Sequence, residues 1–222
     1  MKRFSYVIVF FLAIVFIGCG KKAKKGNKKL AQNYFKSAMV ELSDPQVGSY
    51  HYKKALGYVE QALLNDKKSH YLAMKATLLF KLEQYKESLV AYDQALACCD
   101  DACLKAEVLN NYACLLAQQG NYDRATELFE QLIVDRYYLT PEVALVNLGK
   151  MSAEKNDLKQ AQSYFQRAVT MVPGYLDAHF YLAWSAYLNK NVELAKQEVK
   201  TILYLDADCK AASLLGEKLG IL

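Results

Sequence analysis

The side chains best suited to chemistry in this sequence are six cysteines and three histidines. His51, His70 and His179 stand in separate segments, and no His-Glu-x-x-His motif or paired metal-ligand spacing joins them. Neither a Gly-x-Ser-x-Gly nucleophile motif nor a glycine-rich phosphate loop is present. The sequence therefore predicts a protein that is not an enzyme, with no catalytic residue, no metal, no cofactor and no small-molecule substrate.

Cys19 is the cysteine whose surroundings specify a reaction. Two basic residues precede a 14-residue apolar run, Phe4–Ile17, which is shorter than the ~20 residues that cross a bilayer. The run ends in Gly18 and Cys19, which matches the small-residue-then-cysteine pattern of a bacterial lipobox. We predict a signal peptide over residues 1–18 and acylation of Cys19. Two alternatives are an uncleaved N-terminal anchor and a signal peptide without lipid.

The residues after Cys19 indicate a destination and a spacer. Gly20 stands where many inner-membrane lipoproteins carry Asp. We therefore expect the mature protein to be anchored at the periplasmic face of the outer membrane. Residues 19–30 hold six lysines and no apolar side chain that could be buried before Leu30, which predicts a lipid-anchored, solvated tether. The alternative is that these lysines contact anionic lipid head groups.

The charge of the remaining chain excludes one class of partner. The first 30 residues hold eight basic side chains and no acidic one, whereas residues 31–222 hold 20 basic and 23 acidic side chains. The folded body is therefore slightly acidic and has no basic footprint for nucleic acid. We predict no nucleic-acid partner.

The other five cysteines form an odd set for an oxidising compartment. Cys98 and Cys99 end one predicted helix and Cys103 begins the next, so the geometry permits a disulfide from either of them to Cys103. Cys99–Cys103 is the pair we expect. Cys114 is a competing partner. Cys114 and Cys209 otherwise suit small buried thiols.

The elements that carry these residues repeat at a fixed period. Small residues followed by an aromatic or branched residue and Ala-Leu recur with spacings of 33, 37, 36 and 34, anchored at Ala55, Ser88, Ala125, Ala161 and Ala195. This is the period of the tetratricopeptide repeat (TPR), a pair of antiparallel helices. The 222 residues include only 3 Pro and 10 Gly, which are too few to form the many turns of an all-β fold.

The predicted fold is therefore all-α: a right-handed TPR superhelix of about five helical hairpins plus a C-terminal capping helix. The predicted repeats are residues 31–66, 69–102, 106–139, 142–175 and 176–207, and the cap is 208–222. Small residues such as Ala113 with Ala125, and Gly149 with Ala161, would let paired helices approach closely. An insertion over Ser43–Tyr50 lengthens the first hairpin loop, as a structural variation or as a contact with a partner.

A partner-binding groove is predicted on the concave face, which the first helix of each repeat lines. Its expected residues, counted by repeat register, are Phe80, Asn110, Gln118, Val146, Lys150, Phe180, Trp184 and Tyr187. Aromatic and amide side chains of this kind suit an extended peptide or an amphipathic helix. The alternative is that Phe180 and Trp184 only pack under the capping helix.

The third and fourth repeats resemble one family in particular, the PilF/PilW lipoproteins of type IV pilus biogenesis. The residues that carry the resemblance are Asn110-Asn111-Tyr112, Gln118-Gln119-Gly120-Asn121-Tyr122, Phe129-Glu130, Asp135, Tyr138, Pro141, Ala144-Leu145 and Asn147-Leu148-Gly149. Many members have Cys where this chain has Ala117 and Met151, so no disulfide of the family is carried over.

The resemblance implies a pilotin: an outer-membrane lipoprotein that binds the secretin and promotes its localisation and assembly into the multimer needed for pilus biogenesis. The expected partners are thus the outer-membrane secretin and, through the lipid anchor, the membrane. The alternative is a TPR scaffold lipoprotein of another envelope machine, such as β-barrel assembly or cell-wall synthesis.

Overall fold

The computed structural model describes residues 26–221, and all regular secondary structure in this range is helical. Cys19, the predicted signal peptide and most of the predicted tether lie outside the described residues. The eleven helices of the described range are α1 (Lys28–Leu42), α2 (Ser49–Asn65), α3 (Ser69–Lys81), α4 (Tyr85–Ala97), α5 (Ala102–Gln118), α6 (Tyr122–Val134), α7 (Pro141–Glu154), α8 (Leu158–Met171), α9 (Leu176–Leu188), α10 (Val192–Leu205) and α11 (Lys210–Lys218).

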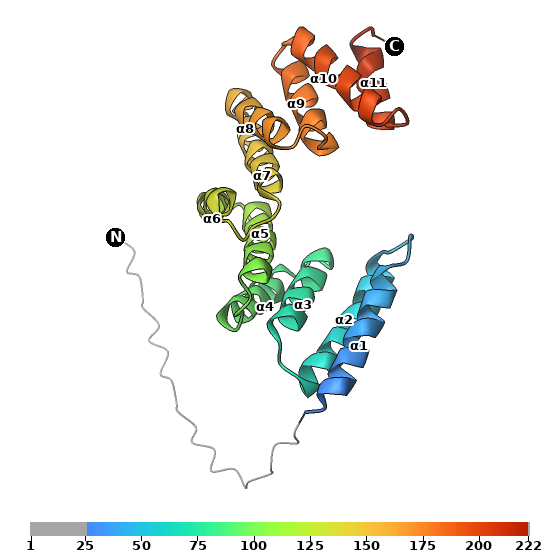
Figure 1. The fold of residues 1–222 in the computed structure, drawn as a ribbon, viewed down its shortest axis with the longest axis vertical. Coiled ribbons are helices and arrows are strands. Elements are labelled where there is room, and N and C mark those ends of the chain that lie inside the picture. Colours follow the sequence, from blue (N-terminus) through green and yellow to red (C-terminus); the bar gives the residue numbers. More distant parts are fainter. Residues whose placement is uncertain (1–25, 222) are drawn as a thin grey trace, which may run out of the picture.

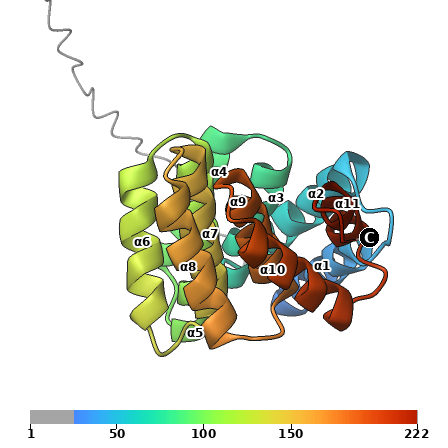
Figure 2. The same cartoon turned by 90° about the horizontal axis from the view of Figure 1, so that it is seen from above.

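Successive helices pair as five antiparallel hairpins, which stack into a curved superhelix (Figure 1). The first helices α3, α5, α7 and α9 contact one another along the inner side of the curve, and α6 and α8 lie on its outer side. Helix α11 packs on α10 at the C-terminal end (Figure 2). The predicted all-α TPR superhelix of five hairpins and a capping helix is confirmed.

The close crossings within hairpins occur at the five repeat anchors. Ala55, Ser88, Ala125, Ala161 and Ala195 all have 0% of their surface exposed. Four of them have no polar side-chain atom to satisfy, and the fifth satisfies its own, because Ser88 Oγ donates to the carbonyl oxygen of Ala76 at 2.7 Å. A small side chain at each anchor therefore lets the paired helices approach closely.

The loops inside hairpins two to five share one conformation. Each has three residues, and the middle residue has a positive φ: 61° at Glu83, 76° at Gly120, 62° at Asn156 and 60° at Lys190. The N–H of the next residue returns to a carbonyl in the last helical turn, as from Asn191 to Ala186 at 2.9 Å. This is a Schellman ending, for which glycine is the favoured residue.

The first hairpin departs from this pattern at both ends. Helix α1 begins at Lys28, inside the predicted tether, because the side chain of Asn27 accepts from the N–H of Leu30 at 3.1 Å and caps the helix. The loop between α1 and α2 spans residues 43–48 and turns at Asp44, whose side chain accepts from the N–H of Gln46 at 2.7 Å. The predicted insertion thus lengthens this loop.

Candidate functional site

Two adjoining cavities open on the inner side of the superhelix, where the first helices of repeats two to five face the hollow of the curve. Their volumes are about 310 and 520 Å³, and they share Lys150 and Glu154 of α7. Together they form a continuous depression from α3 to α9, which we call the inner groove. Its accessible or half-buried lining includes Phe80, Cys114, Gln118, Asn147, Lys150, Glu154, Tyr181 and Trp184.

Polar contacts between repeats fix the first half of the inner groove. Gln118 Nε2 donates to the hydroxyl oxygen of Tyr85 at 2.9 Å, and Asn147 Nδ2 donates to Cys114 Sγ at 3.4 Å. Both bonds join residues 33 apart, so each ties one hairpin to its neighbour. The side chains that line this half are thereby held in place before any partner arrives.

The thiol of Cys114 lies on the floor of this half. Burial raises the pKa of the Cys114 thiol, and the ammonium groups of Lys150 and Lys81 only partly oppose that shift. The thiol therefore stays protonated at neutral pH and is a poor nucleophile. Its place in the groove indicates a packing surface and not a reactive centre.

The second half of the inner groove is built from aromatic rings and ammonium groups. Lys150 Nζ lies 5.3 Å from the ring centre of Tyr181, and Lys218 Nζ of α11 lies 5.7 Å from the ring centre of Trp184. Trp184 also packs against Tyr187, with 5.9 Å between ring centres. Even so, 38% of Trp184 remains exposed, which makes it the large aromatic side chain that the groove offers to a partner.

Four of the eight predicted groove residues come together in the inner groove. Phe80, Gln118, Lys150 and Trp184 line it, from helices α3, α5, α7 and α9 respectively. The register count therefore identifies one residue per repeat that reaches the surface of the groove.

The other four predicted residues are placed differently. Val146 is only 4% exposed, because α9 packs directly on α7 and Val146 shares a core cluster with Leu182; its assignment to the groove is wrong. Phe180 and Tyr187 pack against the core cluster that includes residues of α11. For Phe180 this agrees with the alternative stated above, packing under the capping helix. Asn110 lines neither cavity, and its Nδ2 donates to Asn111 at 3.4 Å.

The register count does not identify every residue that lines the inner groove. Asn147, Glu154 and Tyr181 stand one or more positions away from the counted residues of their helices, and each lines the groove. Only Asn147 has a signal in the sequence, since it follows Cys114 by one repeat period.

The predicted Cys99–Cys103 disulfide is absent from the structure. The Cys99 thiol donates to the carbonyl oxygen of Asp101 at 3.3 Å, and Cys103 is a free, exposed residue in the first turn of α5. Asp101 caps that helix by accepting from the N–H of Leu104 at 2.8 Å, which sets the direction of the connection between the two cysteines.

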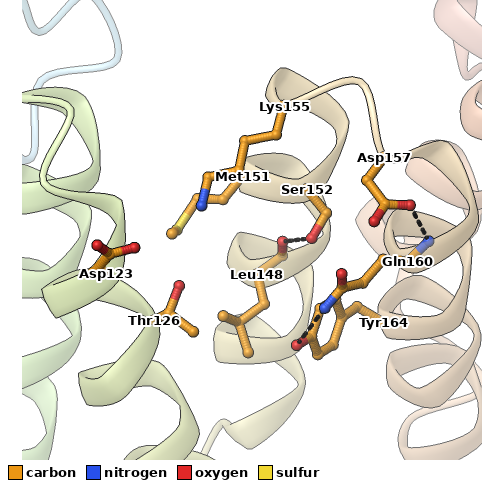
Figure 3. Close-up of a pocket in the computed structure, with 9 residues that line it drawn as sticks. All are labelled: Asp123, Thr126, Leu148, Met151, Ser152, Lys155, Asp157, Gln160 and Tyr164. Atoms are coloured by element: carbon orange, nitrogen blue, oxygen red, sulfur yellow. Dashed lines mark hydrogen bonds between the residues drawn. The ribbon is translucent and has the colours of Figure 1, made fainter.

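A further cavity of about 510 Å³ opens where α6, α7 and α8 meet (Figure 3), and Met151 lines both this cavity and the inner groove. Asp123 and Thr126 of α6 face Leu148 and Met151 of α7 across it, as Figure 3 shows. The side chains that meet at this cavity come from the third and fourth hairpins only. It is thus an indentation between two repeats, whereas the inner groove spans four.

No helix between residues 26 and 221 has the length and apolar character required to cross a bilayer.

Comparison with known proteins agrees with this architecture. Models of the tetratricopeptide repeat match residues 106–136 and 152–219. No curated protein sequence matches the chain.

Solved structures share the fold over most of the chain. The crystal structure of PilW, a widely conserved type IV pilus biogenesis factor, has a TM-score of 0.72 and 23% identity, covering 87% of this chain and 86% of PilW. PilF of Pseudomonas aeruginosa has a TM-score of 0.70 and 21% identity, covering 86% of this chain and 83% of PilF. MamA of Desulfovibrio magneticus RS-1 has a TM-score of 0.63 and 17% identity, covering 84% and 99%.

Stacked helical hairpins of this kind usually serve as scaffolds for protein interaction, because the superhelix presents an extended concave surface. Residues 106–136 and 152–219 match tetratricopeptide-repeat models, and the chain shares its superhelical fold with PilW and PilF.

Proposed function

We propose that this chain is a lipoprotein, anchored through Cys19 to the periplasmic face of the outer membrane, that binds the secretin of a type IV pilus system. In this role it promotes the localisation of the secretin and its assembly into a multimer, and it performs no catalysis. The support comes from the lipobox at Cys19, from the residues of repeats three and four that resemble the PilF/PilW family, and from the fold shared with PilW, a type IV pilus biogenesis factor.

One observation carries the binding part of the proposal: Trp184 keeps 38% of its surface exposed on the wall of a groove that four repeats build together. The ring is preorganised, because Tyr187 packs on it and Lys218 lies over it. A rigid, half-covered tryptophan in a concave site is the usual anchor of a protein interface. An extended segment of the secretin, seated from Phe80 to Trp184, would cover it.

The test compares two aromatic truncations. Trp184→Ala is expected to weaken secretin binding by about 30-fold, the loss typical of a buried hot-spot aromatic. The matched control is Tyr204→Ala, because Tyr204 is 89% exposed on α10 and is not part of the inner groove. Affinity would be measured with the lipidated protein and solubilised secretin, and helix content by far-UV circular dichroism.

The outcomes separate the candidate functions. Equal affinity of wild type and folded Trp184→Ala would overturn the groove as the binding site. If a pull-down of the wild-type protein from outer membranes recovers β-barrel assembly or cell-wall synthesis proteins in place of a secretin, the chain is a scaffold of that machine. Cys19→Ser should release the protein from the membrane or leave the uncleaved precursor, which mass spectrometry of the N-terminus distinguishes.

A further inference from the structure

The first hairpin carries a surface corner where the described chain begins. A Cβ on Gly26 would collide with the carbonyl oxygen of Asn65, so the backbone enters the fold pressed against the last residue of α2. Figure 1 shows the beginning of α1 and the end of α2 side by side at the same end of this hairpin. We call the surface formed by Lys28, Lys29, Leu30, Leu64 and Lys67 the N-terminal corner.

The N-terminal corner combines unpaired positive charge with an exposed apolar side chain. Leu64 is 76% exposed, and Leu30 is 38% exposed. Among the ion pairs of residues 26–221, none involves Lys28, Lys29 or Lys67, all of which are exposed. The acidic groups nearby are already occupied, since Asp66 pairs with Lys68 at 3.6 Å and Glu60 pairs with Lys75 at 2.9 Å.

Helix stability does not explain the two lysines of α1. The first turn of a helix is the positive end of its dipole, where acidic side chains stabilise and basic ones destabilise. Here the first turn holds Lys28 and Lys29 and no acidic residue. An anionic surface outside the chain would compensate for this arrangement.

Apolar surface continues from the corner onto the second hairpin. Leu64 and Lys67 also line a cavity of about 720 Å³ between α2, α3 and α4, whose apolar walls include Leu63, Leu72 and Ala97. A surface that is apolar at its centre and cationic at its rim matches the interface between acyl chains and anionic head groups.

The distance to the proposed anchor makes a lipid surface the occupant. Seven residue steps separate Cys19 from Gly26, which span at most about 25 Å when fully extended. If Cys19 is acylated in the bilayer, the N-terminal corner is the part of the described body held nearest to the head groups. The inference rests on this anchoring, which belongs to the proposed function.

We infer that the N-terminal corner docks on an anionic lipid surface, with Leu64 at the interface and Lys28, Lys29 and Lys67 against the head groups. Each lysine near such a surface strengthens the contact by roughly fivefold. The last hairpin lies at the opposite end of the superhelix (Figure 1), so docking holds the Trp184 end of the inner groove away from the bilayer.

The experiment is lysine footprinting of the full lipidated protein on vesicles, with a water-soluble amine reagent and mass spectrometry. One vesicle is phosphatidylcholine alone, and the other contains about 30% phosphatidylglycerol. Labelling of Lys28, Lys29 and Lys67 should fall at least about threefold on the anionic vesicle only, and high salt should reverse this. Lys159 and Lys200, exposed on α8 and α10, are the internal controls and should not change.

Two variants test the apolar part. Leu64→Ser should reduce the protection of the three lysines, whereas Val90→Ser, at a position 56% exposed on α4, should leave it unchanged. Equal labelling on both vesicles, or equal protection on both, overturns the inference. Protection that depends on protein concentration also overturns it, because a second copy would then cover the corner.

Failure of the anchor is read separately. A protein that does not float with phosphatidylcholine vesicles lacks the anchor, and the proposed membrane attachment is then wrong. In that case flotation with the anionic vesicle still tests the corner: salt-sensitive flotation that is lost in Lys28→Glu with Lys67→Glu supports it, and no flotation overturns it.

Discussion

The ring of Phe165 in α8 packs directly on the backbone of Gly149 in α7. A Cβ added to Gly149 would lie 2.7 Å from Cδ1 and 2.8 Å from Cζ of that ring. Phe165 is 1% exposed and belongs to the core of the fourth hairpin, so moving the ring aside would disturb the contacts of that core. The absence of a side chain at Gly149 is what allows α7 and α8 to meet here.

Gly149→Ala should therefore destabilise the protein by about 1–3 kcal/mol, the usual result of overpacking a close crossing. Urea unfolding followed by circular dichroism measures the loss. The matched control is Gly57→Ala in α2, where an added Cβ meets nothing within 4 Å and helix propensity should raise stability by about 0.5–1 kcal/mol. If both variants shift the midpoint equally, the contact does not limit the residue at position 149.

The Schellman loops predict a stabilising change. Lys190 has a φ of 60°, a conformation that costs a side-chain-bearing residue roughly 1 kcal/mol and glycine nothing. Lys190→Gly should raise the free energy of unfolding by about 0.5–1 kcal/mol. Its neighbour Asn189 has a φ of −83°, so Asn189→Gly should not stabilise. A lower melting temperature for Lys190→Gly would contradict the assigned loop conformation.

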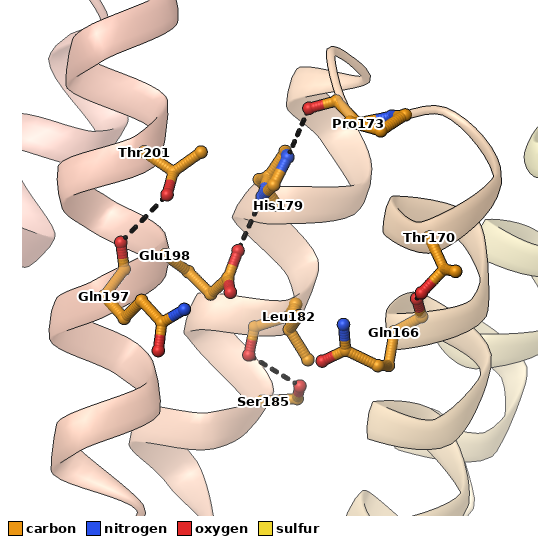
Figure 4. A network of polar contacts seen from close by, with 9 residues as sticks. All are labelled: Gln166, Thr170, Pro173, His179, Leu182, Ser185, Gln197, Glu198 and Thr201. Carbon is orange, nitrogen blue, oxygen red and sulfur yellow. Dashed lines mark hydrogen bonds and ion pairs between the residues drawn. The ribbon is translucent and has the colours of Figure 1, made fainter.

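A buried hydrogen-bonded pair, His179 and Glu198, joins α9 to α10. His179 Nε2 lies 2.9 Å from the carbonyl oxygen of Pro173, which can only accept, so Nε2 carries a proton (Figure 4). His179 Nδ1 lies 2.5 Å from Glu198 Oε2, which is within hydrogen-bond distance. Both side chains are buried, with 5% of His179 and 6% of Glu198 exposed. The pair thereby ties the connection before α9 to the second helix of the same hairpin.

Glu198→Ala should cost about 1–3 kcal/mol, because it leaves a buried imidazole nitrogen without a partner. Glu198→Gln should cost far less, since its amide can still form a hydrogen bond with Nδ1. The exposed Glu193, in the first turn of the same helix, provides the control, and Glu193→Ala should change stability by under about 1 kcal/mol. Urea midpoints that place the Gln variant with the Ala variant would argue against a stabilising hydrogen bond at Nδ1.

The buried hydroxyl of Tyr92 should make the folded protein less stable at alkaline pH. Burial raises the pKa of Tyr92 from 10.0 to about 12, against the opposing contact of its hydroxyl with Thr77 at 3.2 Å. The unfolded chain therefore releases this proton first as the pH rises above 10. The stability that Tyr92 contributes, about 2–3 kcal/mol, should be present below pH 10 and lost between pH 10 and 12.

The measurement is the difference in free energy of unfolding between wild type and Tyr92→Phe at several pH values. The variant removes this titration while keeping the ring, so the difference should shrink or change sign above pH 10. A difference that stays constant from pH 8 to 11.5 would show that the hydroxyl of Tyr92 titrates alike in both states.

Much of the fold follows from one local property, the spacing of small residues. The anchors Ala55, Ser88, Ala125, Ala161 and Ala195 are recognisable in the sequence because close helix crossings exclude larger side chains wherever the hairpin sits. The number of hairpins, the capping helix and the longer first loop all follow from that register. Four groove residues follow too, since each lies on the inward face of its own helix.

Other features depend on contacts between repeats, which no single repeat specifies. Val146 has the register of an inner-groove residue, but the position of α9 on α7 buries it beside Leu182. Asn147 and Tyr181 line the groove, which side chains of four successive hairpins form together. Residue spacing along one helix determines which side chains face its hairpin partner, whereas the stacking of hairpins decides which remaining side chains stay accessible.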